Sequence, residues 1–441
     1  MKSGPRIAID FGTTRTKVAF FDSKHQRAEL IKLGTAQREI IPSVFYIPKA
    51  GQGKVLVGDD AMAQVEFDPA GIVREIKREI DKPGKKHCGA GRLAPTRVEL
   101  AAEMFRLIRR RCEEEVFHGY AIQKCTLTVP ASFSEGQRAK MVEAANQAGF
   151  VDVRLIDEPT AAARAWYEQQ GERMAQHILV VDVGGGTTDF SVVEWATDRF
   201  VPNTRVLPDG FNQGGNDVDD EAFGELLTQQ NEENESKFQA LKDSLLVKLR
   251  GLKEQFAREF KKQKLAVGGM VVDVEADIFR QAEESFLVRL SDELKQYADR
   301  CVNAGMGSLI VVLVGGASRI KGLKARVEAI CPGRVFTWKD SDYATVLGAV
   351  DYPESKVALV SAKLRQACSI YSEALRAVNA TGAIGPAQVD YIMSRRTELG
   401  LDSAVAESLE VEVLGKRIEA TAPAKPVPDQ TVMQMILPAI Q

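Results

Sequence analysis

Two aspartates stand at the same place in two similar segments of this chain. Asp10 lies in IAIDFGTTRTKVAFFD (residues 7 to 22), and Asp182 lies in LVVDVGGGTTDFSVVEW (residues 179 to 195). Each follows an apolar run and precedes a turn of glycine and threonine, after which a second alternating run begins. This pattern predicts a β-hairpin. Backbone N–H groups at such a tip can surround a phosphate, so two facing tips would clamp a polyphosphate and its cation.

The small and hydroxyl residues of the two tips are the predicted phosphate ligands. They are Gly12, Thr13, Thr14, Gly184, Gly185, Gly186 and Thr187. Mg²⁺ prefers oxygen ligands and usually keeps several waters, so Asp10 and Asp182 are predicted to hold a metal ion through those waters. A single aspartate commonly caps its own turn instead. Two at equivalent positions favour the metal role.

The similarity between the halves continues beyond the hairpins. After the first hairpin come KCTLTVPASF, RLIDEP and the small-residue segment TAAARAWYEQQ, and after the second come SLIVVLVGGASR, GRVFTW and DYATVLGAVDY. Both halves therefore predict the same order of strands and helices. Unrelated α/β domains also share such an order, but an aspartate-led hairpin in both halves favours a duplicated fold.

Composition narrows the class of protein. A chain of 441 residues should hold two or three domains, and a net charge of −3 gives no basic field for nucleic acid. The start MKSGPRIAID lacks the apolar core of a signal peptide, and no run approaches the ~18 apolar residues of a membrane helix. The cysteines show no metal-ligand spacing and are expected to be reduced thiols. We expect a cytoplasmic protein with no nucleic-acid or membrane partner.

With EPTAAA and LVGGASRI added to the two hairpins, the chain resembles the nucleotide-binding domain of the heat-shock 70 kDa (DnaK-type) chaperones, within the actin-like ATPase superfamily. The resemblance extends over about residues 6 to 352. It implies an α/β fold with duplicated ribonuclease-H-like halves. Lobe I would be residues 1–165 with a short insert, and lobe II residues 166–352 with a helical insert at about 216–305. ATP or ADP and Mg²⁺ would bind between the lobes.

The resemblance also implies roles for single residues. Lys77 would place its charge against the γ-phosphate and the attacking water, Glu158 would orient that water or accept its proton, and Asp189 would lie near the metal and water. Taken alone, the pattern of IKREIDK is equally typical of a solvated helix face. The remaining nucleotide contacts implied are Lys17, Gly214, Gly215, Glu254, Arg258, Gly315, Gly316, Arg319 and Asp342. Pro130 and Arg138 match a relay from the site to the domain surface.

The expected base pocket departs from the family pattern. Ala257 stands where a lysine is usual, Lys261 where a serine is, and Ala317 where a hydroxyl residue is. Each lost hydrogen bond costs about 0.5–1.5 kcal/mol. We therefore expect weaker ATP binding than in a typical member, with base selectivity left open.

A helical extension is predicted for residues 353–420, followed by a Pro-rich linker and a short apolar end at 421–441. Its apolar stripe at helical spacing is expected to pack on the ATPase or to dock a partner. No peptide-binding β-sandwich is expected. The leading hypothesis is a slow Mg-dependent ATPase that signals its nucleotide state to a client, a co-chaperone or a separate peptide-binding chain. An actin-like filament protein and an exchange factor or scaffold with vestigial hydrolysis are the alternatives, and the oligomeric state is left open.

Overall fold

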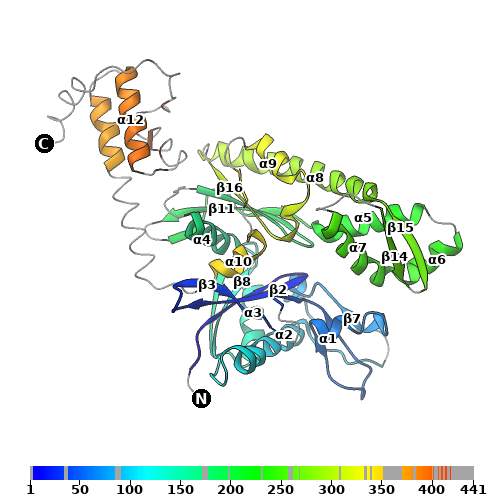
Figure 1. Ribbon diagram of the computed structural model, residues 1–441. Coiled ribbons are helices and arrows are strands. Elements are labelled where there is room, and N and C mark those ends of the chain that lie inside the picture. Colours follow the sequence, from blue (N-terminus) through cyan, green and yellow to red (C-terminus); the bar gives the residue numbers. More distant parts are fainter. Residues whose placement is uncertain are drawn as a thin grey trace.

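Two sheets of the same strand order form the two halves of the protein (Figure 1). The computed structural model describes residues 3–33, 38–84, 91–170, 177–196, 199–229, 232–256, 262–267, 269–306, 309–331, 335–337, 340–350, 370–380 and 384–399, with isolated positions from 401 to 418. The first sheet runs β3-β2-β1-β8-β9 and the second β12-β11-β10-β16-β17, each with one more short strand paired to its second hairpin strand. This shared order confirms the predicted duplicated α/β fold.

The first sheet holds the first hairpin at its centre. Its strands are β1 (Ile7–Phe11), β2 (Arg15–Asp22), β3 (Arg27–Leu30), β4 (Ile40–Pro42), β8 (Lys124–Val129) and β9 (Asp152–Asp157). Strand β1 is antiparallel to β2 and parallel to β8. Helices α2 (Arg97–Arg111) and α3 (Glu135–Gln147) contribute to the same apolar core, and each begins with a reciprocal capping box, at Thr96 and at Ser134.

A small sheet beside this lobe carries the lysine-bearing segment. It consists of β5 (Phe45–Tyr46), β6 (Leu56–Val57) and β7 (Ile72–Val73), with the short helix α1 (Asp59–Met62) between the last two. Strand β7 leads into a 3-10 turn at Lys77–Glu79, which places Lys77 in a buried position. The segment is therefore not a solvated helix face.

The second sheet repeats the arrangement. Its strands are β10 (His177–Val183), β11 (Thr188–Ala196), β12 (Arg199–Pro202), β13 (Asp209–Phe211), β16 (Ile310–Val314) and β17 (Val335–Phe336), and helix α9 (Leu323–Ile330) follows β16. Residues 310–314 are all buried, which is typical of a central parallel strand covered on both faces.

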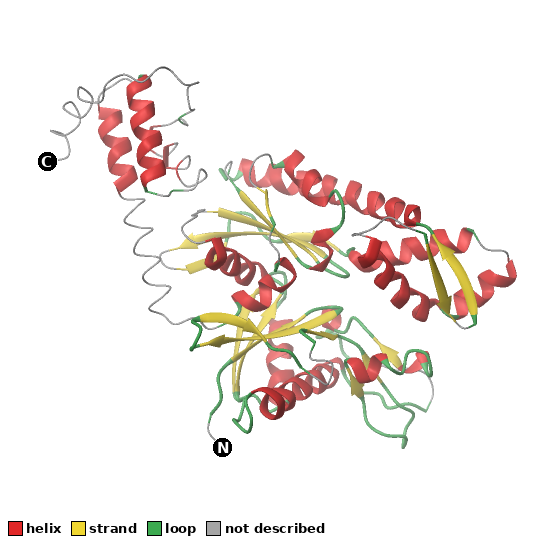
Figure 2. Ribbon diagram, viewed as in Figure 1, coloured by secondary structure: helices red, strands yellow, loops and turns green. Residues whose placement is uncertain are grey.

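The insert of the second lobe extends to the right in Figure 1. It contains α5 (Gly215–Thr228), α6 (Glu232–Ala240), α7 (Lys242–Phe256) and the long α8 (Ala276–Asn303). We expected a helical insert, and the structure adds a two-stranded hairpin, β14 (Gln263–Val267) with β15 (Met270–Val274), visible among the helices in Figure 2.

The small-residue helices pack against each other between the two sheets. They are α4 (Glu158–Gln170) and α10 (Ala344–Gly348). A Cβ atom built on Gly348 would lie 1.7 Å from the Ala161 carbonyl oxygen, so only glycine permits this approach. The alanines of TAAARAW thus serve close helix packing.

Two tail helices are described, residues 370–380 and α12 (Pro386–Glu398). Tyr371, Leu375 and Val378 of the predicted stripe are buried, in one apolar cluster with Trp166 of α4. The earlier stripe positions and residues 421–441 lie outside the described part of the chain. Within the described part, no helix combines the length and apolar character needed to cross a bilayer.

Candidate active site

A cavity of about 840 Å³ lies between the two hairpin tips and is lined by both lobes. Most of the predicted site residues line it. They are Asp10, Gly12, Thr13, Thr14, Lys17, Lys77, Glu158, Asp182, Gly184, Gly185, Thr187, Asp189, Gly215, Gly315, Gly316, Arg319 and Asp342. The fold thus gathers into one cavity residues that are spread from position 10 to position 342.

The first hairpin presents a buried carboxylate with three partners nearby. Gly12 N donates to the Arg15 carbonyl at 3.0 Å and closes the tip. Asp10 accepts hydrogen bonds from Thr128 Oγ1 at 2.9 Å and from Lys17 Nζ at 3.2 Å. Burial raises the pKa of Asp10, but the charges of Lys17 and Lys77 and the Thr128 bond outweigh it, so the pKa lies below its ordinary value. Asp10 is therefore ionised at neutral pH.

The second hairpin places two more carboxylates opposite each other. Asp182 and Asp189 are paired in the β10–β11 register, and Gly184 N closes the tip on the Thr187 carbonyl at 2.9 Å. Burial, with Glu158, Asp189 and Asp10 nearby, raises the pKa of Asp182 to about 8. Gly315 lies behind it at φ +85°, where an added Cβ would be 2.3 Å from Asp182 Oδ1. The GG turn after β16 therefore needs glycine at this position.

Lys77, which is buried, and Glu158, which is partly buried, form an ion pair across 81 residues of sequence, with Nζ and Oε1 2.5 Å apart. Burial lowers the pKa of Lys77, but the charges of Glu158 and Asp10 raise it by a larger amount, so the pKa lies above its ordinary value. The pKa of Glu158 is raised, mainly by burial and in part by Asp10 and Asp189, against the effect of Lys77. The lysine therefore carries a charge within the cavity.

The turn formed by Gly214 and Gly215, which precedes α5, packs directly on the second hairpin. Gly215 N donates to the Gly184 carbonyl at 3.0 Å, and a Cβ on Gly214 would lie 2.5 Å from the same carbonyl oxygen. Gly214 N donates to Asp217 Oδ2 at 2.8 Å at the start of α5. The amino end of α5 is thereby held against the tip of the second hairpin, and Gly215 and Asn216 line the cavity.

Not every predicted contact can be placed. Gly186 and Gly214 lie beside the lining residues, at the second hairpin tip and before α5. Helix α7 is described as far as Phe256, and Glu254 is described only as part of that helix. Ala257, Arg258 and Lys261 lie outside the described residues. Arg319 forms an ion pair with Asp342 at 3.0 Å. The roles assigned to all these residues stay predictions.

The predicted relay residues are connected to the site. Arg138 donates to Asp157 Oδ1 at 2.5 Å and to the Phe133 carbonyl at 3.2 Å. Asp157 directly precedes Glu158, and Pro130 and Phe133 line the cavity. These contacts provide a path from the α3 surface to the cavity, while coupling along it stays a prediction.

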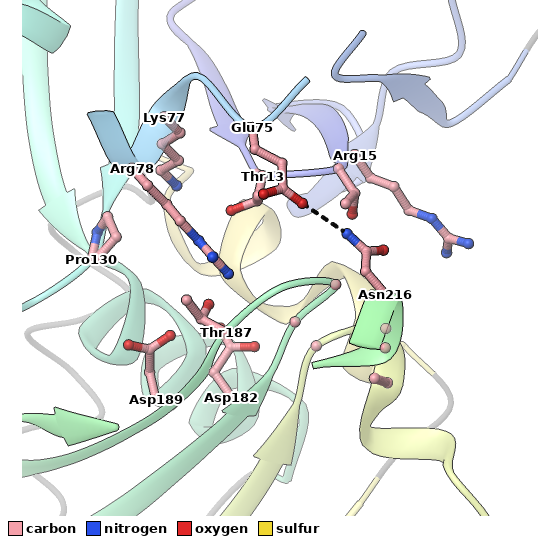
Figure 3. A pocket seen from close by; sticks show the side chains of 18 of the residues that line it. Thr13, Arg15, Glu75, Lys77, Arg78, Pro130, Asp182, Thr187, Asp189 and Asn216 are labelled. Carbon is pink, nitrogen blue, oxygen red and sulfur yellow. Dashed lines mark hydrogen bonds between the residues drawn. The ribbon is translucent and has the colours of Figure 1, made fainter. Parts of the chain in front are cut away.

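Sequence reasoning missed several lining residues. Figure 3 shows Glu75 and Arg78 reaching into the cavity beside Lys77, and Asn216 Nδ2 donating to Glu75 Oε1 at 3.2 Å between the lobes. On the other wall, Asp219 pairs with Arg250 at 3.0 Å and with Lys253 at 2.6 Å. The alternating charges of REIKRE were a signal for the first group. The second group has no local pattern that distinguishes it from a solvated helix face.

Comparison with known proteins identifies the family of this chain. The family model described as "Hsp70 protein" matches residues 84–350. The chain belongs to the Hsp70 family. It is 30% identical over 370 residues to a protein named "Chaperone protein HscA homolog" from Burkholderia thailandensis, covering 78% of this chain and 57% of that protein. It is 27% identical over 358 residues to "Chaperone protein DnaK" from Mycoplasmopsis agalactiae, with the same coverage of 78% and 57%. The chain thus spans somewhat more than half the length of these curated relatives.

Proposed function

We propose that this Hsp70-family protein binds Mg·ATP in the cavity between the two hairpins and hydrolyses it slowly to ADP and phosphate. The Lys77–Glu158 ion pair supports this most directly. Lys77 is only 5% exposed and lines a polar cavity, and the stability of the fold does not require a lysine at such a position. Hydrolysis of a γ-phosphate depends on positioning and on charge neutralisation. Lys77 would neutralise charge on the γ-phosphate, and Glu158 would position the attacking water.

The hairpin tips fit a polyphosphate. A Cβ built on Gly185 would lie 2.5 Å from Thr14 Oγ1, so the two tips approach each other and any side chain at this glycine would enter the space between them. Thr13, Thr14 and Thr187 offer hydroxyls there. We propose that these groups, with the backbone N–H groups of Gly12 and of residues 184–186, bind the phosphates.

The carboxylates fit a divalent cation. Asp10, Asp182 and Asp189 line the cavity, and the charges of Asp10 and Asp189 add to burial in raising the pKa of Asp182 to about 8. A bound cation would relieve the repulsion. We propose that Asp10 and Asp182 hold Mg²⁺ through waters; when bound, the ion would neutralise phosphate charge and align its oxygens.

The chain's own residues divide the remaining work. Glu158 would orient the attacking water and accept its proton, a task that suits a carboxylate whose pKa is raised by burial. Lys77 would hold its ammonium against the γ-phosphate oxygens, and its bond to Glu158 keeps it in place before substrate arrives. Asp189 would assist in holding the water.

We further propose that nucleotide state is signalled by lobe closure to a protein partner, such as a client, a co-chaperone or a separate peptide-binding chain, in the cytoplasm. The close crossing of α4 and α10 is the proposed hinge between the lobes. The burial of Tyr371 and Leu375 in the cluster of Trp166 supports the interpretation of the tail as an appendage packed on the ATPase.

Single-turnover hydrolysis of ATP with Mg²⁺, measured over a wide range of protein concentration, tests the proposal. Glu158→Gln should abolish most of the rate. Glu143→Gln is the matched control, because Glu143 is a half-buried glutamate of α3 that does not line the cavity. Slow hydrolysis that is independent of concentration supports the chaperone-type ATPase. A rate that rises steeply with concentration indicates a filament, and ATP binding without hydrolysis indicates a scaffold with a vestigial site.

A further inference from the structure

Arg78 directs a guanidinium with unused hydrogen-bond donors into the cavity. Its side chain lines the cavity, and its Nε and Nη2 atoms are shielded from solvent and have no hydrogen-bond partner among the described residues. Leaving a buried donor unsatisfied costs about 1–3 kcal/mol, and more when the group is charged. An arginine kept in this condition at the edge of a ligand cavity indicates that its partner is the ligand.

The guanidinium lies against the tip of the second hairpin, across the cavity from its own lobe. A Cβ built on Gly186 would be 2.5 Å from Arg78 Nη2 and 3.2 Å from Cζ. Figure 3 shows the side chain running from beside Lys77 toward Thr187. Glycine at position 186 thus makes room for the arginine at the proposed phosphate turn.

The backbone that carries Arg78 is held on both sides. Glu75 accepts the hydrogen bond of Asn216 from the other lobe at 3.2 Å, and Lys77 is fixed by Glu158 at 2.5 Å. Asp189 and Asp217 experience the positive charge of Arg78 without a hydrogen bond to it. The guanidinium is therefore positioned before any ligand binds, which is the condition under which donors stabilise developing charge most effectively.

We propose that Arg78 is a catalytic residue that binds the γ-phosphate of ATP in the transition state, as an arginine finger supplied within the chain. This inference rests on the proposed ATPase function. The water oxygen bonds to the γ-phosphorus while the bond to the β,γ-bridging oxygen breaks, giving ADP and inorganic phosphate. The water proton passes to Glu158. Arg78 keeps its own proton and forms no covalent bond; its planar fork binds two phosphoryl oxygens at once, which an ammonium cannot do.

The test compares Arg78→Ala and Arg78→Lys with the unmutated protein. Arg27→Ala is the matched control, because Arg27 is an arginine of the same lobe with 69% of its side chain exposed. Three quantities are measured for each variant: the single-turnover rate, the affinity for ADP, and the affinity for ADP with aluminium fluoride, which imitates the transferring phosphoryl group. The ADP affinity also shows whether a variant has folded.

We expect Arg78→Ala to lower the single-turnover rate by about 10³-fold, as for other arginine fingers. Its affinity for ADP should stay within about twofold of that of the unmutated protein. Affinity for the aluminium fluoride complex should fall with the rate, Arg78→Lys should recover little, and added guanidinium ion should partly restore the alanine variant. A rate within about threefold of the unmutated protein would overturn the role of Arg78. Equal losses of ADP and aluminium fluoride affinity would also overturn it. Absence of hydrolysis by the unmutated protein would instead refute the proposed function, and the catalytic role with it.

Discussion

Replacing Gly348 by alanine should force apart the two helices that cross between the lobes. Gly348 is the buried last residue of α10, and an added Cβ would lie 1.7 Å from the Ala161 oxygen and 2.6 Å from its carbonyl carbon. Both are backbone atoms of α4 and cannot rotate away as the end of a side chain can. Carbon–oxygen contacts need about 3.3 Å, so one helix must move by roughly 1.6 Å relative to the other.

The expected cost follows from this displacement. Overpacking of a filled core typically costs about 1–3 kcal/mol, and the upper end applies here because the obstruction is backbone. The better helix propensity of alanine offsets about 0.5–1 kcal/mol of this cost. We therefore expect Gly348→Ala to lower the free energy of unfolding by about 2 kcal/mol.

Gly224→Ala is the matched control, since Gly224 is a helical glycine of α5 whose added Cβ would meet no atom within 4 Å. The free energy of unfolding of that variant should rise by about 0.5–1 kcal/mol, a change of opposite sign. Urea unfolding followed by tryptophan fluorescence measures both, because Trp166, one of three tryptophans, is fully buried in α4 beside Phe336. If Gly348→Ala proved as stable as Gly224→Ala, the close crossing would not exist as described.

Three further predictions concern buried charges and the tail. Lys77→Met leaves the Glu158 carboxylate without its partner and should lower the free energy of unfolding, measured with urea, by about 3–5 kcal/mol. The double variant with Glu158→Gln should recover part of this loss, and additive losses would show that the pair does not interact. Burial and Arg205 lower the pKa of His177 from 6.5, so the unfolded state takes up the proton first and stability should fall as pH drops below 6.5, a dependence that His177→Gln should reduce in melting curves. Glu410, fully buried and accepting from Tyr371 OH at 2.6 Å, should hold the tail together. Glu410→Ala should speed hydrogen exchange in α12 by a local loss of about 1–3 kcal/mol while leaving hydrolysis unchanged; unaltered exchange would contradict this.

Much of the fold could be predicted because its signals are local. The alternation of apolar residues around the Gly/Thr tips predicts both hairpins, and the observed register places Asp10 opposite Lys17 and Asp182 opposite Asp189. The alanines of TAAARAW predict the close helix crossing. The β14–β15 hairpin inside the insert was missed, since its short strands follow a long helical pattern.

The site could be predicted only in part. Residues within the two tips are marked by their own turns, so Thr13, Thr14 and Thr187 were found from the pattern itself. Lys77 and Glu158 were identified through the resemblance, because a lysine in IKREIDK and a glutamate before Pro159 are ordinary in isolation. Arg78 was missed for the same reason.

The sequence by itself determined which chemical groups are present and where the chain turns, because glycine, threonine and the period of apolar residues act over a few positions. Only the tertiary structure decided which groups face each other: Lys77 against Glu158, Glu75 against Asn216 of the other lobe, and Arg78 against Gly186. The raised pKa of Asp182 arises in the same way, from burial and from neighbours distant in sequence. Coulomb energy, desolvation and hydrogen bonding depend on distance in space, and no local pattern of residues encodes that distance.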